Sequence, residues 1–403
     1  MKILLISSFL PYPLTSGGHI RLYNLLKQLS KRHSITLICE KRSYQTQSDI
    51  EYVEKVCKKV LYVERKKQWS FTNILRTGLS AYPFLLVGHT SLEMTRLIIQ
   101  ELKRNAYDLI HVETSYVMQN LPSSDIPVVL VEHNIEYLVY KRFVKNAPFF
   151  VKPLLLFDIM KLKYWEEQFW ERVTKLVAVS EEEKRLMKRD DVAVVPNGVD
   201  LAKFKIQNSK FKIGRKEKRA LFIGDFRWVQ NRDAVQWLLT VIWPEIRNPK
   251  SLPAGRQGEI RNPKLWIVGK KIPDSIKKLG NDQDVVFDEN APEDAAEIFK
   301  NADVLLSPIR VGGGTSFKIL EAMASGVSVV TTSLGIEGIE AEDGKEVLIA
   351  DDVKGLANNI IRVIGDEKMY REIAQKARKV VEEKYDWEII VKKLEEVYQS
   401  VVA

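Results

Sequence analysis

Residues 307–332 contain, in close succession, a strand, a glycine-rich turn, a helix and a second strand. They read SPIRVGGGTSFKILEAMASGVSVVTT. The first strand ends near Pro308, and either Thr315 or Ser316 is positioned to cap the helix. Backbone N–H groups of a glycine run beside a helix N-terminus favour a bound anion. The pattern therefore predicts a diphosphate cradle built from Gly312, Gly313, Gly314 and Thr315.

Two charged residues follow in the same helix. Lys318 lies in the first turn, where a cation opposes the helix dipole, so an anionic ligand nearby would explain its presence. Glu321 lies one turn on from Phe317, where a carboxylate can accept hydrogen bonds from both hydroxyls of a ribose. Taken alone, Glu321 is more simply interpreted as an ordinary glutamate on a helix surface.

The rest of the chain repeats this alternation of short apolar strands and helices. Strands are predicted in the first half at Ile3–Ser7, Ile35–Cys39, Val60–Val63, Leu109–Val112, Val128–Val131 and Leu176–Val179. In the second half they are predicted at Ala220–Ile223, Leu265–Val268, Val285–Phe287, Val304–Leu306, Val329–Thr332 and Val347–Ile349. Continuous apolar strands separated by helices indicate parallel sheets covered on both faces. Two such sets predict an α/β protein with two doubly wound domains.

The domain boundary is predicted just after VVPNGVD, Val194–Asp200, where a strand ends in a Pro-Asn-Gly turn. The Lys-rich residues 203–219 are interpreted as a linker. We therefore expect an N-terminal domain at 1–200, a C-terminal domain at 201–385 and a closing helix at 386–403. EIRNPK occurs twice, at Glu245–Lys250 and Glu259–Lys264, and is interpreted as a local duplication in a surface loop without a function.

The bulk properties fit this division. A chain of 403 residues is long enough for two domains of roughly 200 residues each. A formal net charge of +9 favours anionic partners, but no zinc-finger, RRM-like or basic-aromatic pattern is present, so nucleic acid is not expected. Cys39 and Cys57 have no metal-ligand spacing, and a reduced cytoplasmic location is expected.

The N-terminus, MKILLISSFLPYPL, is interpreted as a buried strand, because its apolar run is short and lacks a small-residue cleavage site. No apolar run approaches the roughly 18 residues needed to cross a bilayer. The sequence thus favours a soluble protein that at most lies on a membrane surface. After the first strand, Gly17 and Gly18 open a predicted helix, where their N–H groups can face an anion or a sugar. A simple strand-to-helix turn is an equally good interpretation of this glycine pair.

Residues 141–163 mix six basic residues with bulky apolar ones and a single acid, Asp158. A basic amphipathic surface of this kind can contact anionic lipid. The alternative, which the sequence favours, is a packed interdomain helix with a solvated basic face.

Several segments together resemble family-four (group 1) glycosyltransferases. GGGT, KILEAMASG and VVTT are similar to that family's donor-binding segment. In chain order, further similar segments are SGGHIRLYNLL, VVLVEHNIEY, VAVSEEEKRLM with VVPNGVDLAKF, GDFRWVQNRDAVQWL, NADVLLSPIR and YDWEIIVKKLEEVY. The resemblance covers nearly the whole chain apart from the repeat.

The resemblance implies a GT-B fold, with two Rossmann-like domains facing a central cleft. It implies transfer of a hexosyl group, with retention of configuration, from a UDP- or GDP-linked nucleotide-sugar to a glycan or lipid-linked acceptor in cell-surface polysaccharide or glycoconjugate synthesis. The donor would bind mainly to the C-terminal domain and the acceptor to the N-terminal one. No cofactor is implied, and no metal is expected, because no D-x-D pair lies at a strand end.

The resemblance also assigns residues. Glu321 matches the second glutamate of the family's Glu-x7-Glu pattern, and His133 is the best match to its active-site histidine. His133 follows an apolar strand, where ligands gather in open α/β sheets, and it can hydrogen-bond the sugar or shuttle a proton. His111 is a weaker rival, and His19 is a third.

Two departures from the family pattern leave alternatives open. The first glutamate of Glu-x7-Glu is replaced by Gly313. The family's phosphate-binding Arg and Lys align with Asp225 and Gln230, so Arg227 or Arg232 is the expected substitute. A nucleotide-sugar epimerase of the same fold, or a nucleotide-sugar-binding protein with impaired catalysis, therefore remains a competing interpretation.

Overall fold

The structure is a computed structural model of the chain. It describes residues 1–144, 147–204, 217–247, 263–280, 283–292, 294–312 and 314–402. Gly313, most of the expected linker and most of the EIRNPK repeat lie outside these residues. The chain divides into two compact units. Unit 1 comprises Met1–Asn197 and Trp387–Ala403, and unit 2 comprises Gly198–Asp386.

Unit 1 is built on a parallel sheet whose strand order, among the described residues, is β3-β2-β1-β4-β5-β6-β7. Its strands are β1 (Lys2–Ser7), β2 (Ser34–Lys41), β3 (Lys59–Glu64), β4 (Leu109–Glu113), β5 (Val128–Val131), β6 (Lys175–Ala178) and β7 (Ala193–Val194). The chain runs outward from β1 in one direction and then returns to continue from β4 in the other. This order is that of a Rossmann sheet, which binds ligands where the direction reverses.

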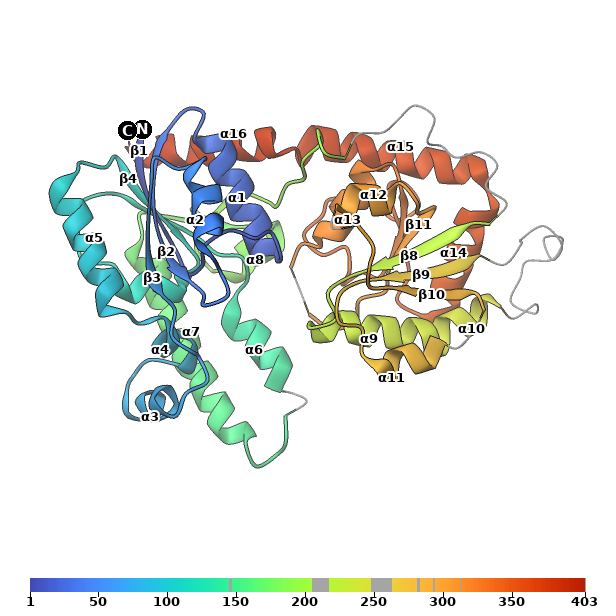
Figure 1. Cartoon of the computed structure of the whole chain (residues 1–403), viewed down its shortest axis with the longest axis horizontal. Helices are drawn as coiled ribbons and strands as arrows, with labels where there is room; N and C mark the ends of the chain where they lie inside the picture. Colours follow the sequence, from blue (N-terminus) through green and yellow to red (C-terminus); the bar gives the residue numbers. More distant parts are fainter. Residues whose placement is uncertain are drawn as a thin grey trace. The chain divides into compact units, whose positions relative to one another are not determined.

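Helices cover both sides of this sheet (Figure 1). They are α1 (Gly17–Leu29), α2 (Gln47–Glu54), α3 (Phe71–Leu79), α4 (Phe84–His89), α5 (Leu92–Arg104), the 3-10 helix η1 (Ser115–Asn120), α6 (Glu136–Val144), α7 (Lys152–Arg172), α8 (Glu181–Leu186) and α16 (Trp387–Val402). Helix α16 is last in sequence but belongs to unit 1 and contacts α1. The core holds strand residues such as Leu4, Ile110 and Leu130, each fully buried.

Unit 2 repeats the same topology, with strand order β10-β9-β8-β11-β12-β13. Its strands are β8 (Arg219–Ile223), β9 (Lys264–Val268), β10 (Val285–Asp288), β11 (Val304–Ser307), β12 (Ser328–Thr331) and β13 (Leu348–Ile349). Its helices are α9 (Val229–Trp237), the π-helical turn η2 (Leu238–Ile242), α10 (Trp243–Ile246), α11 (Asp274–Lys277), the 3-10 turn η4 (Lys278–Gly280), α12 (Ala295–Phe299), α13 (Phe317–Ala324), α14 (Val353–Gly365) and α15 (Glu367–Lys384).

Alternation along the strands of unit 2 fills a core on each face of the sheet. Phe222 and Leu306 pack into one apolar cluster, whereas Leu221 and Leu305 pack into the other. Because successive side chains of a strand point to opposite faces, a strand covered by helices on both faces is apolar throughout. Every strand predicted from such runs is confirmed, with ends that differ by at most two residues.

Candidate active site

In unit 2, the glycine run lies where two helices begin at neighbouring strands. Helix α9 follows β8, helix α13 follows β11, and β8 and β11 are paired in parallel. A Cβ atom added to Gly312 would lie 3.6 Å from the Cβ atom of Gln230. The expected diphosphate cradle therefore lies beside the start of α9, at the carboxyl edge of the sheet.

The backbone of the run requires glycine. Gly312 has a φ of +115° and Gly314 a φ of +84°, a region that side chains other than glycine rarely adopt. Ser316 is the N-cap residue of α13, but no side chain forms the capping hydrogen bond that the sequence favoured. The buried Thr315 hydroxyl has no hydrogen-bond partner among the described residues. A buried hydroxyl that lacks a hydrogen-bond partner fits a site that binds a polar ligand.

Lys318 reaches from α13 across to α9. Its Nζ donates a hydrogen bond of 2.9 Å to Oδ1 of Asn231 and lies 4.9 Å from the centre of the Phe222 ring. Burial lowers the pKa of Lys318 to about 8. The sequence predicted Lys318 as a binding residue but did not single out Asn231. Asn231 fixes the direction in which the Lys318 ammonium points.

Glu321 lies one turn further along α13. Burial raises the pKa of its carboxyl group to about 7, against the opposing influence of Lys203. Lys203 itself pairs with Asp294 at 3.2 Å. Within the described part of the chain, no hydrogen bond or ion pair reaches the Glu321 carboxylate. A carboxylate with a raised pKa and no protein partner is typical of a functional site.

The two arginines expected to bind phosphate, Arg227 and Arg232, both form hydrogen bonds to residues of the turn that precedes α9. The Nε atom of Arg227 donates to Oδ2 of Asp225 at 2.8 Å. Arg232 donates to the backbone oxygens of Phe226 and Arg227 at 2.7 and 2.9 Å. The structure thus gives both guanidinium groups protein partners, and their phosphate-binding role stays a prediction.

In unit 1, the carboxyl edge of the sheet is occupied by a buried carboxylate between two histidines. Nε2 of His133 donates a hydrogen bond of 2.6 Å to Oε1 of Glu113, and Nε2 of His111 donates one of 2.6 Å to Oε2. Burial alone would raise the pKa of Glu113, but the two histidines hold it well below its ordinary value. Glu113 therefore stays ionised and fixes both imidazole rings.

His111 is enclosed by this network, whereas His133 reaches the surface. The side chain of His111 is 0% exposed and that of His133 is 17% exposed. Nδ1 of His111 accepts a 2.6 Å hydrogen bond from the hydroxyl of Tyr398 in α16. Of the two, only His133 has a ring edge that a substrate can touch.

Arg21 completes the network from α1. Its Nε lies 3.5 Å from Oε1 of Glu113, and its terminal nitrogens donate to the backbone oxygens of Val195 and Pro196. The residue after Glu113, Thr114, has a φ of +71°, which is strained for a β-branched side chain. Backbone strain beside a buried charged network is typical of functional sites.

Gly18 of the predicted glycine pair lies against His133. A Cβ atom added to Gly18 would lie 3.6 Å from Cε1 and Nδ1 of His133 and 3.3 Å from Phe9. Gly17 begins α1, and the Ser16 side chain caps that helix. His19, the third histidine considered, donates from Nδ1 to the Pro13 carbonyl at 2.8 Å and is buried, which lowers its pKa. The absence of a side chain at Gly18 thus leaves space beside Nδ1 and Cε1 of the His133 ring.

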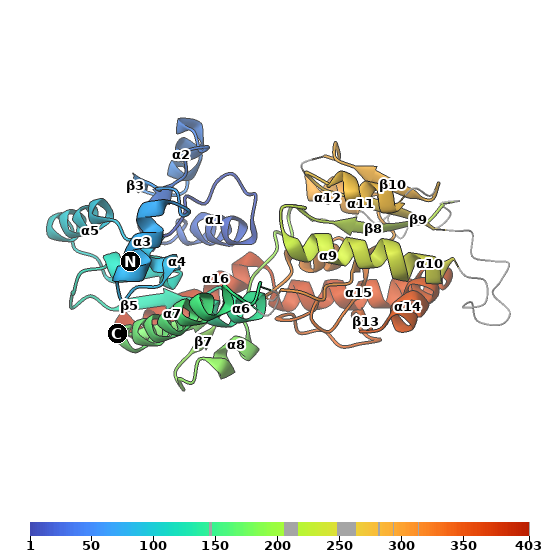
Figure 2. The ribbon, with the colours of Figure 1, turned by 90° about the horizontal axis from the view of Figure 1, so that it is seen from below.

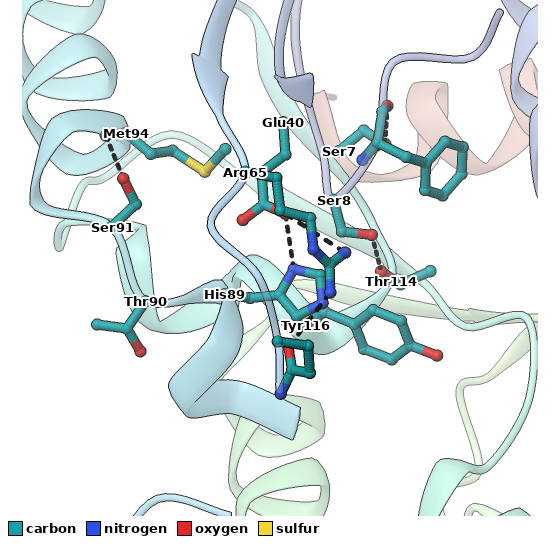
Figure 3. A network of polar contacts seen from close by, with 12 residues as sticks. Ser7, Ser8, Glu40, Arg65, His89, Thr90, Ser91, Met94, Thr114 and Tyr116 are labelled. Atoms are coloured by element: carbon teal, nitrogen blue, oxygen red, sulfur yellow. Dashed lines mark hydrogen bonds and ion pairs between the residues drawn. The ribbon is translucent and has the colours of Figure 1, made fainter. Parts of the chain in front are cut away.

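A second polar network lies further along the same edge (Figure 3). Nδ1 of His89 lies 2.9 Å from Oε2 of Glu40, and Arg65 pairs with the same oxygen at 3.6 Å. The Tyr116 ring lies 5.3 Å from that of His89. Burial lowers the pKa of His89 and of Arg65. The Glu40 carboxylate thus has two partners inside the protein, the His89 ring and the Arg65 guanidinium.

Neither carboxylate of these two networks was predicted from the sequence. Glu40 and Glu113 each end or nearly end an apolar strand, in the contexts ICEK and LIHVE. The signal that could have identified them is a carboxylate at the carboxyl end of a buried parallel strand.

The described residues contain neither a candidate metal-binding cluster nor a candidate membrane-spanning helix. No group of three or more His, Cys, Asp or Glu side chains there is arranged to hold a metal ion. No helix in that part of the chain is both long and apolar enough to span a membrane.

Comparison with solved structures assigns the fold class. Sucrose-phosphate synthase from Thermosynechococcus elongatus matches with a TM-score of 0.70 and 14% identity, covering 99% of each chain. The Anabaena HepE protein in complex with UDP-glucose matches with a TM-score of 0.64 and 16% identity, covering 99% of this chain and 100% of that one. The two parallel Rossmann-like sheets are those of a GT-B glycosyltransferase.

Sequence comparison gives the family. The model described as "Glycosyltransferase Family 4" matches residues 15–203, and that described as "Glycosyl transferases group 1" matches residues 217–366. A 44.6 kDa protein in the cps region of Klebsiella pneumoniae is 26% identical, over 96% of each chain. The chain belongs to the family-four (group 1) glycosyltransferases, which confirms the resemblance found in its sequence.

Proposed function

We propose that this glycosyltransferase moves a hexosyl group, with retention of configuration, from a UDP- or GDP-linked sugar to a glycan or lipid-linked acceptor. Unit 2 would bind the donor and unit 1 the acceptor. The observation that carries the proposal is a cluster in unit 2 beside the glycine run. It consists of a half-buried carboxylate, a half-buried ammonium and a hydroxyl without a hydrogen-bond partner among the described residues. Glu321, Lys318 and Thr315 supply these three groups.

The chemistry of the cluster matches the parts of a nucleotide-sugar. The glycine backbone and the Lys318 ammonium suit the diphosphate, because both offer positive charge or N–H donors. The Glu321 carboxylate suits the ribose, whose two hydroxyls are donors. The UDP-glucose bound by the similar HepE protein supports a nucleotide-sugar as donor.

His133 would act on the sugar or acceptor side. Its Nε2–H is committed to Glu113 at 2.6 Å, so Nδ1 is left as the atom that can accept or relay a proton. Glu113 is a positioning residue, which holds the ring in one orientation and stabilises its protonated form. The cps-region relative supports a cell-surface polysaccharide or glycoconjugate as the product. The site of action would be cytoplasmic.

Purified protein incubated with UDP-, GDP- and ADP-sugars tests the proposal. A thermal-shift screen should identify the donor, since a ligand at 100 times its Kd adds about 2.7 kcal/mol of stability. With that donor and a glycan or lipid-linked acceptor, we expect a glycosidic product of retained configuration. An epimerised free nucleotide-sugar as sole product would instead assign an epimerase, and binding without any turnover would assign a binding protein.

A further inference from the structure

Unit 1 exposes large apolar side chains on two neighbouring parts of its surface. In α3, Phe71 is 80% exposed and Leu79 is 82% exposed. Around the start of α7, Phe149 is 84% exposed and both Phe150 and Leu154 are 71% exposed. We define the α3–α7 face as the exposed side chains of residues 66–79, 139–144 and 147–164. Apolar groups exposed to this extent and in this number mark an interaction surface.

The two parts of the face are joined by hydrogen bonds. Nζ of Lys161 in α7 donates to the backbone oxygens of Thr77 and Ser80, at the end of α3, at 2.8 Å each. Nε1 of Trp165 donates to the oxygen of Ala81 at 3.0 Å. Helix α6 packs against α7. Figures 1 and 2 both show α3, α4 and α7 close together at one end of unit 1.

Helix α7 is apolar on its outward side as well as its inward side. Ile159 and Leu162 are buried, but Phe157 is 55% exposed and Met160 is 68% exposed. A surface helix of a soluble protein normally presents polar residues outward. The outward side therefore resembles the apolar side of an interfacial helix more than the solvated basic side that the sequence favoured.

The charge of this face is mostly positive. Residues 66–79, 139–144 and 147–164 together contain eight basic residues and one acid, Asp158, and Glu64 and Glu167 lie outside it. Oδ1 of Asp158 accepts the backbone N–H of Phe84 at 2.9 Å, so its charge is held within unit 1. Exposed basic residues of the face include Lys66, Lys67, Arg76, Lys141 and Arg142.

We propose that the α3–α7 face binds the surface of an anionic lipid bilayer. Apolar rings would enter the acyl boundary while lysines and arginines bind the headgroups, as in interfacial helices. A second copy of the chain is a poor occupant, because a symmetric dimer through this face would bring like charges together. The proposal does not depend on the transfer reaction, because binding can be measured without any donor.

Flotation of the full-length protein with vesicles tests the proposal. We expect binding to phosphatidylglycerol-containing vesicles at low salt and little binding to phosphatidylcholine alone. Raising the salt from 0.1 M to 1 M reduces the Debye length from about 10 to about 3 Å and should release the protein. No binding to the anionic vesicles at low salt would overturn the proposal.

Paired variants separate this face from the overall charge. Lys66→Glu/Lys67→Glu should lower the partition coefficient by roughly 30-fold or more, at about fivefold for each basic residue lost. Lys392→Glu/Lys393→Glu makes the same charge change at exposed positions of α16 and should change it little. An equal loss in both variants would assign binding to net charge and would overturn the proposal.

A second pair tests the apolar part. Phe71→Ser/Leu79→Ser should lower the partition coefficient at least about tenfold, whereas Val241→Ser/Leu279→Ser, at exposed positions of unit 2, should not. Thermal melting shows that each variant is folded, and light scattering gives its oligomeric state. If wild-type protein forms a dimer that Phe71→Ser/Leu79→Ser abolishes, the face binds a second copy, and the bilayer proposal is wrong.

Discussion

The carboxyl edges of the two sheets differ in how their buried charges are satisfied. In unit 1, Glu113 is fully buried and contacts His111, His133 and Arg21. In unit 2, the carboxylate of Glu321 has no hydrogen bond or ion pair within the described residues. Two sheets with the same topology thus differ: the Glu113 carboxylate at the end of β4 has three charged or polar partners, and the Glu321 carboxylate in α13 has none among the described residues.

This difference in partners gives the two carboxylates different roles. A buried charge with all its partners in the protein rigidifies its surroundings and holds a neighbour in place. A buried charge without partners is costly, and a ligand that supplies the missing hydrogen bonds removes that cost. The raised pKa of the Glu321 carboxyl group reflects this cost. We therefore expect substitutions in unit 1 to affect stability and turnover, and those in unit 2 to affect ligand affinity.

The largest effect is expected for Glu113→Ala. It would leave Arg21 buried without the carboxylate with which it pairs, and both histidines without their acceptor. Removing one partner of a buried charge network costs about 3–5 kcal/mol. Urea unfolding, monitored by hydrogen exchange of the strands of unit 1, measures this loss of stability. Glu321→Ala is the control, and a loss as large in that variant would remove the distinction between the two edges.

His133→Ala should lower kcat by about 10²- to 10⁴-fold, the usual contribution of a positioned acid or base. The affinity for the nucleoside diphosphate should stay near that of the wild type, because His133 belongs to unit 1. Steady-state kinetics and calorimetry on the folded variant give both numbers. If His111→Ala is folded but inactive while His133→Ala stays active, the wrong histidine has been assigned.

Nucleotide affinity should depend on pH in both directions. Ligand binding needs Glu321 ionised, so affinity should fall as pH drops through the pKa of about 7. It also needs Lys318 protonated, so affinity should fall as pH rises through the pKa of about 8. Affinity should be greatest near pH 7.5 and roughly sixfold weaker at pH 6.

Two variants separate the limbs of this profile. Glu321→Gln should bind more weakly but lose the acid limb, and Lys318→Gln should lose the alkaline limb. Calorimetry from pH 6 to pH 9 follows both. If each limb persists in the variant that should lack it, other groups control the binding.

The smallest effect is expected from deleting residues 245–258, one copy of the repeat with its spacer. The deletion restores the same order, WPEIRNPK, because the second EIRNPK replaces the first. Buried Ile246 of α10 is thereby replaced by Ile260. Halving a loop changes its closure entropy by only about 0.6 kcal/mol. An unchanged melting temperature and undiminished transfer rate are expected, and a marked loss of either would show that the insert has a role.

The sequence predicted the strands well, because these depend on local patterns. Apolar runs such as Ile3–Ser7 specify a buried parallel strand wherever it pairs. The Glu113 network was beyond such reasoning, because Arg21, His133 and Tyr398 meet only after α1, β5 and α16 pack together. The exposed face of α3 was missed for a related reason. Its apolar residues were indistinguishable from core residues until the fold left them uncovered.

The donor site proposed for unit 2 is tested most directly by the affinity of Glu321→Ala for the nucleotide-sugar donor. Calorimetry measures this affinity beside that of the wild type. Loss of a charged acceptor from two hydroxyl donors costs about 1.5–3 kcal/mol, which is roughly 10- to 100-fold in Kd. Glu342→Ala, an exposed glutamate of the same unit, should bind like wild type. We expect the Glu321→Ala protein to be folded and at least tenfold weaker in binding. An unchanged Kd in that folded variant would contradict the assignment of unit 2 as the donor site through Glu321.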